Sequence, residues 1–372
     1  MVEVPASALP APRADLAGHA PYGAPRIDVP HLLNVNENPY PPSPELAADI
    51  ARAVEAAARQ LNRYPDRDFD ELRARLADHY ADDSHVPGLT AAQVWAANGS
   101  NEIMHQLLLA YGGPGRTALG FAPHYSMYPQ YARDTFTGWA RAERGPAPDF
   151  ALTADDVRSA ITRNDPHIAV LTSPNNPTGT ALDLDAVTAA AAALAPRGGL
   201  VIVDEAYAEF RRDGVPSALT LLAAHPNLVV TRTLSKAFAL AGARLGVAIA
   251  HPQVVDQLRV VRLPYHLSAI SQAVARTALE HRSDLLARVD ELRAERDALA
   301  DHLRERGHDV APSDANFLLW RTFTDRSAVF RALLERGILV RETGPDGWLR
   351  VSIGTPADNA AFRTALEEAD PR

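Results

Sequence analysis

Residues 227–246 have the sequence NLVVTRTLSKAFALAGARLG, in which an apolar run ends in a polar cluster. Two similar runs precede this one: HIAVLT at 167–172 comes before SPNNPTG, and LVIV at 200–203 comes before DEAY. Strands that are apolar on both faces and alternate with helices indicate a parallel or mixed sheet that is covered on both sides. Because ligands of such sheets bind at the carboxyl ends of the strands, we expect the three polar clusters to meet in one crevice of an α/β fold.

The flanking sequence divides the chain into three parts. Residues 1–42 form a proline-rich arm, and residues 43–270 form a large domain that starts with the amphipathic helix pattern SPELAADIARAVEAAARQL. From about residue 285, a long amphipathic helix leads into strand-like NFLLW, ILVRE and WLRVSIG and two further helix patterns. This order of helix and strand patterns predicts a smaller α+β domain over residues 271–372.

The composition points to small-molecule chemistry. The 372 residues carry a formal charge of −9, and the acidic residues are scattered, so we expect no binding of nucleic acid or of a membrane surface. No stretch approaches the roughly 18 apolar residues of a membrane span. The chain has no cysteine, which excludes disulfides and thiolate metal sites, and we predict no metal site and a cytoplasmic location.

Lys236, inside the opening stretch, is the only lysine of the chain, which otherwise uses 36 arginines. Phosphate-binding loops and protein kinases need a lysine after glycine or in V-A-I-K, whereas this lysine follows a serine. A lysine in a partly desolvated site can offer a neutral amine as nucleophile or base, which arginine cannot. The alternative is a chance survivor of arginine-rich coding. Such a residue would lie on an exposed face, but the neighbours Leu234, Ala237 and Phe238 are apolar.

Four motifs occur along the chain in the order SPNNPTG, VIVDEAYAEF, TRTLSKAFALAGARLG and LRVSIGT. Together they resemble the pyridoxal-phosphate-dependent aminotransferases of fold type I, and the closest resemblance is to the histidinol-phosphate aminotransferase family. The similarity extends from NENPYPP at 36–42 to LRVSIGTPADN, which is nearly the whole chain. It implies a large domain with a mixed, mostly parallel sheet between helices, a small α+β C-terminal domain, and a homodimer with shared active sites.

The resemblance places the cofactor, pyridoxal 5′-phosphate, on residues of these motifs. Lys236 matches the lysine that binds the cofactor covalently, and Asp204 matches the aspartate that keeps the pyridine nitrogen protonated. Asn176 and Tyr207 match the groups that hydrogen-bond the 3-oxygen of the cofactor. Lys236, Asp204 and Tyr207 are therefore the predicted catalytic residues.

The remaining cofactor-binding positions implied by the resemblance are of three kinds. An arginine, two hydroxyls and the amides at a helix N-terminus suit the phosphate of the cofactor. One tyrosine is expected to stack on the ring, and another to reach the phosphate from the partner subunit. In the order phosphate, ring and partner subunit, these positions are Ser100, Asn101, Thr233, Ser235 and Arg244, then Tyr125, then Tyr64.

Each of these assignments has a purely structural alternative. An aspartate after an apolar strand often caps a helix or forms an ion pair, and SPNNPTG consists largely of residues that favour turns. Ser100 can cap the helix that it opens. A single tyrosine belongs more often to a core or an interface than to a ligand site.

For the substrate, the resemblance points to arginines near the C-terminus and polar side chains of the arm. Arg350 matches the arginine that grips the acidic end of the substrate, Arg341 is a second anion contact, and Tyr22 and Asn36 close the pocket. The implied reaction converts L-histidinol phosphate and 2-oxoglutarate to imidazole-acetol phosphate and glutamate in histidine biosynthesis. An aromatic aminotransferase, a threonine-phosphate decarboxylase and a regulator that binds pyridoxal phosphate without turnover stay open as alternatives.

Overall fold

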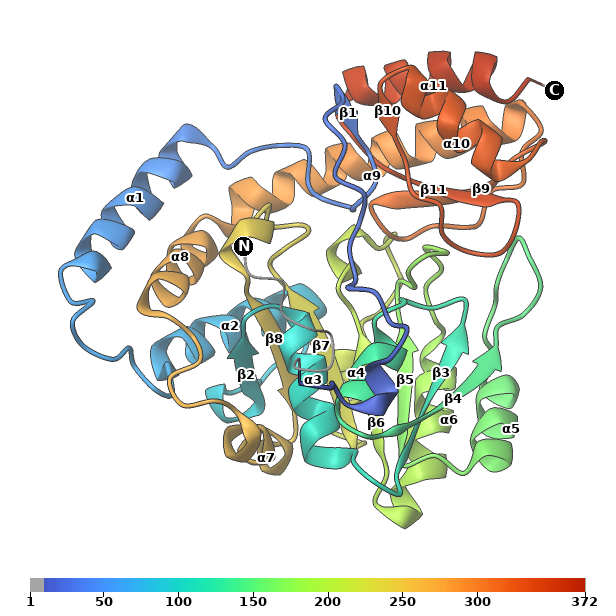
Figure 1. Cartoon of the computed structure of the whole chain (residues 1–372). Coiled ribbons are helices and arrows are strands. Elements are labelled where there is room, and N and C mark those ends of the chain that lie inside the picture. Colours follow the sequence, from blue (N-terminus) through green and yellow to red (C-terminus); the bar gives the residue numbers. More distant parts are fainter. Residues whose placement is uncertain (1–9, 372) are drawn as a thin grey trace.

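A seven-stranded sheet forms the centre of the larger part of the chain in the computed structural model, which describes residues 10–371 (Figure 1). Its strand order is β2-β8-β7-β6-β5-β3-β4. β8 runs antiparallel to both of its neighbours and all other pairs are parallel, so the prediction of a mixed, mostly parallel sheet is confirmed. The strands are β2 (Val94–Ala97), β3 (Thr117–Ala122), β4 (Gly138–Glu143), β5 (Ile168–Thr172), β6 (Leu200–Asp204), β7 (Leu228–Thr233) and β8 (Gly246–Ala250).

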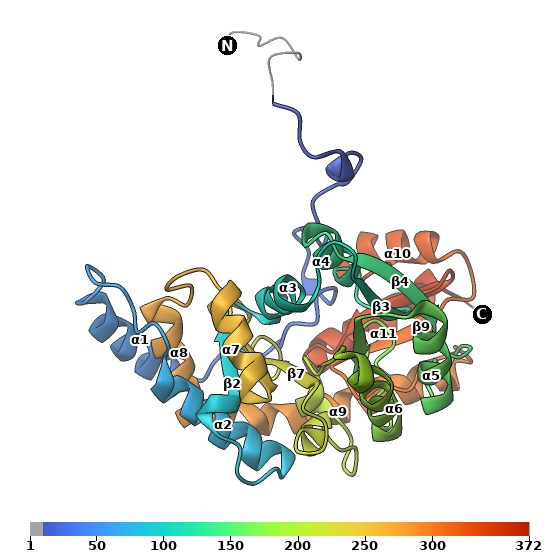
Figure 2. The same ribbon diagram turned by 90° about the horizontal axis from the view of Figure 1, so that it is seen from below.

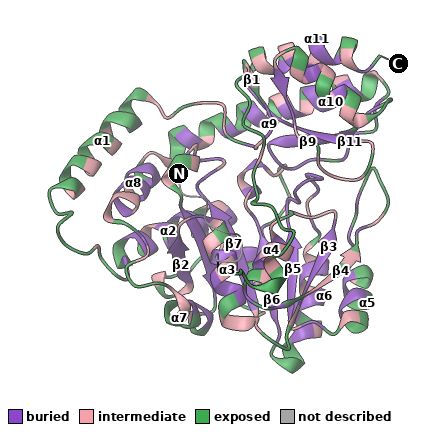
Figure 3. Ribbon diagram, in the orientation of Figure 1, coloured by how far each residue is buried: buried purple, intermediate pink, exposed green. Residues whose placement is uncertain are grey.

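Helices cover both faces of this sheet. Every residue of β5, β6 and β7 is buried, which requires cover on both sides of the strands (Figure 3). α5 packs on α6, α3 packs against α4 and α7, and α8 packs against α1 and α2. These helices are α1 (Pro44–Ala58), α2 (Asp70–Ser84), α3 (Ser100–Tyr111), α4 (Tyr128–Asp134), α5 (Ala154–Asn164), α6 (Leu184–Leu194), α7 (Pro252–Val261) and α8 (Ala269–Glu280).

A smaller α+β part follows at the C-terminal end. The 24-residue helix α9 leads into it from α8, and β9 pairs in antiparallel fashion with β11 (Figure 1). α10 and α11 pack against each other and against β10. The elements are α9 (Arg282–Glu305), β9 (Phe317–Arg321), α10 (Arg326–Glu335), β10 (Ile338–Leu339), β11 (Trp348–Ser352) and α11 (Pro356–Ala369).

The N-terminal arm is tied to this C-terminal part. Strand β1 (His31–Leu32) pairs in parallel with β10, a contact that the sequence does not predict. Before β1, residues 10–30 contain only the short 3-10 helix η2 (Ala14–Leu16), which lies near the outer end of the described part of the arm (Figure 2). Next to η2, the guanidinium of Arg13 lies 4.2 Å from the ring centre of Phe136. The arm therefore passes from the large sheet to the small one.

Short 3-10 helices complete the connections, and they are η3 (Ala91–Gln93), η4 (Ala195–Arg197), η5 (Ala208–Phe210), η6 (Ala218–Leu221) and η7 (Ala241–Ala243). Within residues 10–371, none of the helices combines the length and the apolar character that crossing a membrane requires.

Candidate active site

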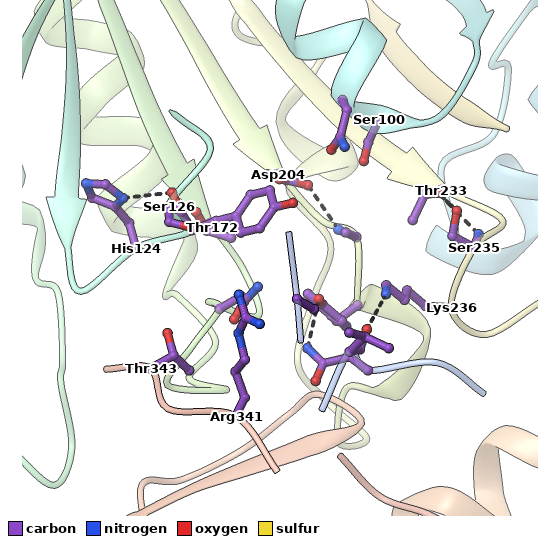
Figure 4. A pocket seen from close by; sticks show the side chains of 18 of the residues that line it. Ser100, His124, Ser126, Thr172, Asp204, Thr233, Ser235, Lys236, Arg341 and Thr343 are labelled. Atoms are coloured by element: carbon purple, nitrogen blue, oxygen red, sulfur yellow. Dashed lines mark hydrogen bonds between the residues drawn. The ribbon is translucent and has the colours of Figure 1, made fainter. Parts of the chain in front are cut away.

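A cavity lies at the carboxyl ends of β5, β6 and β7, where the sequence predicts that three polar clusters meet (Figure 4). It encloses about 990 Å³, part of which is open to solvent. Its walls come from the strand ends, the start of α3, the arm and the C-terminal part. The predicted site residues among its lining are Tyr22, Asn36, Ser100, Asn101, Tyr125, Asn176, Asp204, Tyr207, Thr233, Ser235, Lys236, Arg244, Arg341 and Arg350.

Lys236 projects into this cavity from the loop after β7 (Figure 4). Its Nζ donates a hydrogen bond to the backbone carbonyl of Val35 in the arm at 3.0 Å. Burial, followed by the positive charges of Arg350 and Arg244, lowers the pKa of Lys236 to about 8, although the negative charge of Glu37 opposes this. With that pKa, about a tenth of the amine is neutral at pH 7. The one lysine of the chain can therefore accept a proton under ordinary conditions.

Asp204 ends β6 and is buried at the floor of the cavity. Its carboxylate accepts hydrogen bonds from the hydroxyls of Tyr128 at 2.8 Å and Thr231 at 3.1 Å, and from the amide of Ala206 at 3.3 Å. Burial raises the pKa of Asp204, and the bonds from Tyr128 and Thr231 oppose the rise. No basic side chain of residues 10–371 forms an ion pair with Asp204. Because a buried carboxylate needs a partner, Asp204 is suited to accept a hydrogen bond from a cationic or protonated group of a ligand.

One end of the cavity is shaped for an anion. Gly99 has a left-handed backbone (φ 87°), and a Cβ atom there would lie 2.5 Å from Nη2 of Arg244. A Cβ at Gly246 would lie 2.1 Å from the amide nitrogen of Ser100. No side chain caps the N-terminus of α3, so its first amides remain available to a ligand. Two glycines thus let a helix N-terminus and a guanidinium converge, which is an arrangement that binds phosphate.

Arg350 occupies the opposite wall, on β11, and is 6% exposed. Its Nη1 donates to Oδ1 of Asn176 at 2.6 Å and its Nη2 donates to the carbonyl of Asn34 at 2.8 Å, while its Nε has no hydrogen-bond partner. Arg341 forms an isolated antiparallel bridge with Arg350 and points into the same cavity (Figure 4). Within residues 10–371, no carboxylate lies within ion-pair distance of Arg341 or Arg350. Their charges are available to an anionic ligand.

The arm lines one side of the cavity with the side chains of Tyr22 and Asn36. Tyr22 packs edge-on against Tyr125, with ring centres 6.1 Å apart. Asn36, which is buried, donates from Nδ2 to the hydroxyl of Tyr207 at 3.0 Å. Together with the bond from Lys236 to Val35, these contacts connect the arm to three walls of the cavity.

Tyr64 is the one predicted site residue that does not line this cavity. It is 79% exposed, and its ring stacks on Tyr265 with centres 4.4 Å apart. Its predicted role is in the partner subunit, so its place outside its own chain's cavity leaves that prediction as it stands.

Several lining residues escape the sequence analysis. Tyr128 is the most important, because it is fully buried and bonds to both Asp204 and Thr172. The stretch PHYSMY contains it, and the spacing of three residues from Tyr125 could have indicated that the two rings touch; they meet edge to face, with ring centres 5.6 Å apart. The other polar lining residues in this group are Asn34, His124, Ser126, Thr172 and Thr343.

Known proteins with the same overall pattern are numerous. The sequence model of the family "aminotransferase class I and II" matches residues 30–366. Histidinol-phosphate aminotransferase of Thermobifida fusca is 58% identical over 360 residues, which cover 97% of this chain and 95% of that protein. The protein of the same name from Frankia casuarinae is 56% identical over 355 residues, which cover 95% of this chain and 89% of that protein. The solved structure of histidinol-phosphate aminotransferase from Sinorhizobium meliloti in complex with pyridoxal-5′-phosphate superposes with a TM-score of 0.81 at 24% identity, covering 92% of this chain and 91% of that one.

Proposed function

The chain belongs to the class I and II aminotransferase family, and we propose that it is a histidinol-phosphate transaminase that uses pyridoxal 5′-phosphate. It transfers the amino group of L-histidinol phosphate to 2-oxoglutarate, which yields imidazole-acetol phosphate and glutamate in histidine biosynthesis. One observation carries the proposal. A lysine of lowered pKa, a buried aspartate and three arginines without carboxylate partners line one cavity, in a chain more than half identical to proteins of that name.

The donors and acceptors of the cavity fit each polar group of pyridoxal phosphate. The amides of Ser100 and Asn101 and the guanidinium of Arg244 suit its phosphate, since Gly99 and Gly246 leave the close approach that a Cβ would fill. When bound, the cofactor draws electrons away from the Cα of the substrate. The further residues assigned to its phosphate, ring, ring nitrogen and 3-oxygen are Thr233, Ser235, Tyr125, Asp204, Asn176 and Tyr207.

Lys236 holds and moves the proton of the reaction. Because its pKa is about 8, its Nζ is partly neutral near pH 7 and can accept a proton from the substrate Cα. The carbonyl of Val35 keeps this amine directed into the cavity. A positioned acid–base group of this kind contributes about 10² to 10⁴ to the rate. Arginine at this position would stay charged at every working pH.

The substrate anion is assigned to Arg350 and Arg341. Both lack a carboxylate partner within residues 10–371, and the guanidinium fork suits the phosphate of histidinol phosphate as well as the carboxylate of glutamate. Tyr22 and Asn36 close the cavity from the arm. The same two arginines would then serve both half-reactions, because the donor histidinol phosphate carries a phosphate and the acceptor 2-oxoglutarate carries a carboxylate, and a guanidinium binds either anion.

The proposal includes a homodimer with shared active sites, in which Tyr64 reaches the phosphate in the partner subunit. Exposed large apolar side chains support it: Leu61 is 58% exposed, Val260 75%, Leu263 72% and Tyr265 39%, and the ring of Tyr265 stacks on Tyr64. The boundary between the domains at 270/271 and a cytoplasmic location stay predictions.

A mixing experiment tests the shared site. Lys236→Ala and Tyr64→Ala subunits are each expected to be nearly inactive, and the mixture to regain activity through hybrid dimers with one intact site. Sedimentation at several concentrations checks that the dimer forms. A mixture with no regained activity, in dimers shown to exchange subunits, would contradict the sharing.

A donor panel tests the reaction itself. Purified enzyme is supplied with 2-oxoglutarate and, in turn, with histidinol phosphate, phenylalanine and threonine phosphate, and glutamate and CO₂ are measured. We expect glutamate mainly from histidinol phosphate, and none with Lys236→Ala. Equal turnover of phenylalanine would indicate an aromatic aminotransferase, and CO₂ from threonine phosphate a decarboxylase. Cofactor binding without turnover of any donor would indicate a regulator.

A further inference from the structure

A chain of hydrogen bonds runs from β11 to the hydroxyl of Tyr207. It starts at Ser352, which is buried and lies two residues after Arg350, so that both side chains are on the same face of the strand. The hydroxyl of Ser352 accepts a hydrogen bond from the backbone amide of Asn36 at 2.8 Å and lies 3.0 Å from Oδ1 of Asn36. A backbone amide can only donate, and a serine hydroxyl has a single proton. Among residues 10–371, the carboxamide of Asn36 is the one group in reach that can accept this proton, so Ser352 donates it to Oδ1; a reversed carboxamide would leave the proton without an acceptor.

This bond fixes which way the carboxamide of Asn36 faces. With Oδ1 turned to Ser352, the NH₂ group is turned to Tyr207, and Nδ2 lies 3.0 Å from its hydroxyl oxygen. The backbone of Asn36 is also held, because it adopts a left-handed conformation (φ 56°) and its carbonyl accepts from Nδ2 of Asn316 at 3.1 Å. Asn36 is only 1% exposed, so water offers it no alternative partner.

The orientation of Asn36 in turn decides what Tyr207 can do. An NH₂ group has only donors to offer, so the oxygen of Tyr207 accepts from Asn36 and its own proton is left for another acceptor. No acceptor for that proton is found among residues 10–371, and Tyr207 lines the cavity. Burial raises the pKa of Tyr207, so the hydroxyl keeps its proton at neutral pH. The hydroxyl thus presents a donor to whatever acceptor the cavity holds.

We propose that Ser352 is a positioning residue for the reaction: through Asn36 it turns the proton of Tyr207 towards the 3-oxygen of pyridoxal phosphate. Ser352 itself does not line the cavity. The proposal rests on the pyridoxal-phosphate-dependent function proposed above. It also gives a physical link between the strand that carries Arg350 and a donor to the cofactor, since residues 350 and 352 move together as parts of one strand.

Absorbance of the enzyme loaded with pyridoxal phosphate gives a readout that does not depend on turnover. A hydrogen bond to the 3-oxygen favours the deprotonated form of the bound chromophore, so a weaker donor raises the pH midpoint of the absorbance change. We expect Ser352→Ala to raise this midpoint by about 0.5 to 1 pH unit, which is part of the effect of losing the donor altogether. Ser352→Thr, which keeps the hydroxyl, is expected to retain the wild-type midpoint.

Ser313→Ala is the matched control. Ser313 is buried in the same part of the chain, and its hydroxyl makes the same two kinds of bond: it accepts from the amide of Ala315 at 3.2 Å and donates to the carbonyl of Phe317 at 2.6 Å. It does not line the cavity. We expect Ser313→Ala to lower thermal stability about as much as Ser352→Ala but to leave the absorbance midpoint unchanged.

A double variant tests whether the effect passes through Tyr207. Tyr207→Phe alone is expected to raise the midpoint, and adding Ser352→Ala to it is expected to change nothing further. An equal rise in both backgrounds, or an unchanged midpoint in folded Ser352→Ala, would overturn the proposal. If Ser352→Ala does not fold, Ser352→Cys replaces it, because a thiol fills the same place but is a weak donor and is likewise expected to raise the midpoint. A wild-type protein that forms no chromophore on Lys236 would instead refute the function on which the proposal rests.

Discussion

Replacing Arg350 by methionine should raise the pKa of Lys236. Burial and neighbouring charges lower this pKa from 10.5 to about 8, which corresponds to about 3 kcal/mol against the charged amine. Burial is the largest cause and Arg350 the second, so we assign to Arg350 a rise of about 0.5 to 1 pH unit. At pH 7 the neutral fraction of the amine would then fall from about 9% to about 1 to 3%.

The single lysine makes the measurement direct. An amine-selective reagent applied to the apoprotein from pH 6 to 10 can modify only Lys236 and the N-terminal amine, because arginine does not react. Trypsin then separates the two, since modified Lys236 resists cleavage and residues 233–244 stay in one peptide. The rate of formation of this peptide against pH gives the pKa of Lys236. Circular dichroism checks that each variant is folded.

Two further variants test whether the pKa of Lys236 responds to nearby charges in the expected direction, and whether any lost arginine of the cavity has the same effect. Glu37→Gln removes the charge that opposes the shift, so we expect the pKa of Lys236 to fall below that of the wild type. Arg341→Met removes a cation from the same cavity that does not act on Lys236, so no change is expected. The reasoning is refuted if wild-type Lys236 titrates near 10.5, or if Arg341→Met raises its pKa as much as Arg350→Met does.

Three other outcomes follow from buried polar groups of the large domain. Arg232 is fully buried and pairs with Glu205 at 2.9 Å and Glu209 at 3.1 Å, so Arg232→Met should lower the free energy of unfolding by about 3 to 5 kcal/mol in urea denaturation. Burial raises the pKa of Glu209 from 4.5 to about 7 in the folded protein. The folded state therefore binds this proton more tightly than the unfolded state, which contributes to stability below pH 4.5. The contribution is lost as the pH rises through 7. Glu209→Gln should therefore reduce the fall in stability between pH 4.5 and 8, measured by urea unfolding at each pH. Tyr128→Phe removes a bond to the carboxylate of Asp204 and should weaken pyridoxal phosphate binding about tenfold in a fluorescence titration, with unfolding as the control for stability.

Local sequence patterns predict more of the fold than of the site. The amphipathic pattern after Ser43 forms α1, and the Ser43 hydroxyl accepts from the amide of Leu46 at 3.2 Å, as expected of a helix cap. The three apolar runs form β5, β6 and β7 because strands buried on both faces are legible as continuous apolar sequence. Strand β1 could not be predicted, since two residues have no period and the strand exists only through its pairing with β10.

In the site, too, some features could be predicted from local sequence and others could not. Motif residues next to strand ends could be predicted, because their position along the chain fixes their place in the sheet. The bonds of Ser352 and Arg350 to the arm join residues 316 positions apart, and no local pattern encodes such contacts. The carbonyl of Val35 is a further case, because a backbone group has no sequence signature at all. What the sequence leaves open is therefore mainly how the arm meets the cavity.

The cavity also explains why a chain that contains 36 arginines has one lysine. Lys236 and Arg350 are both cations of the same cavity, and the charge of Arg350 helps to lower the pKa of Lys236. If both were lysine, the two amines would titrate as a coupled pair, and either could lose the proton. If both were arginine, neither could accept one. One permanent charge beside one titratable amine gives a defined base and a defined anion contact, so the two positions require different residues although both require a cation.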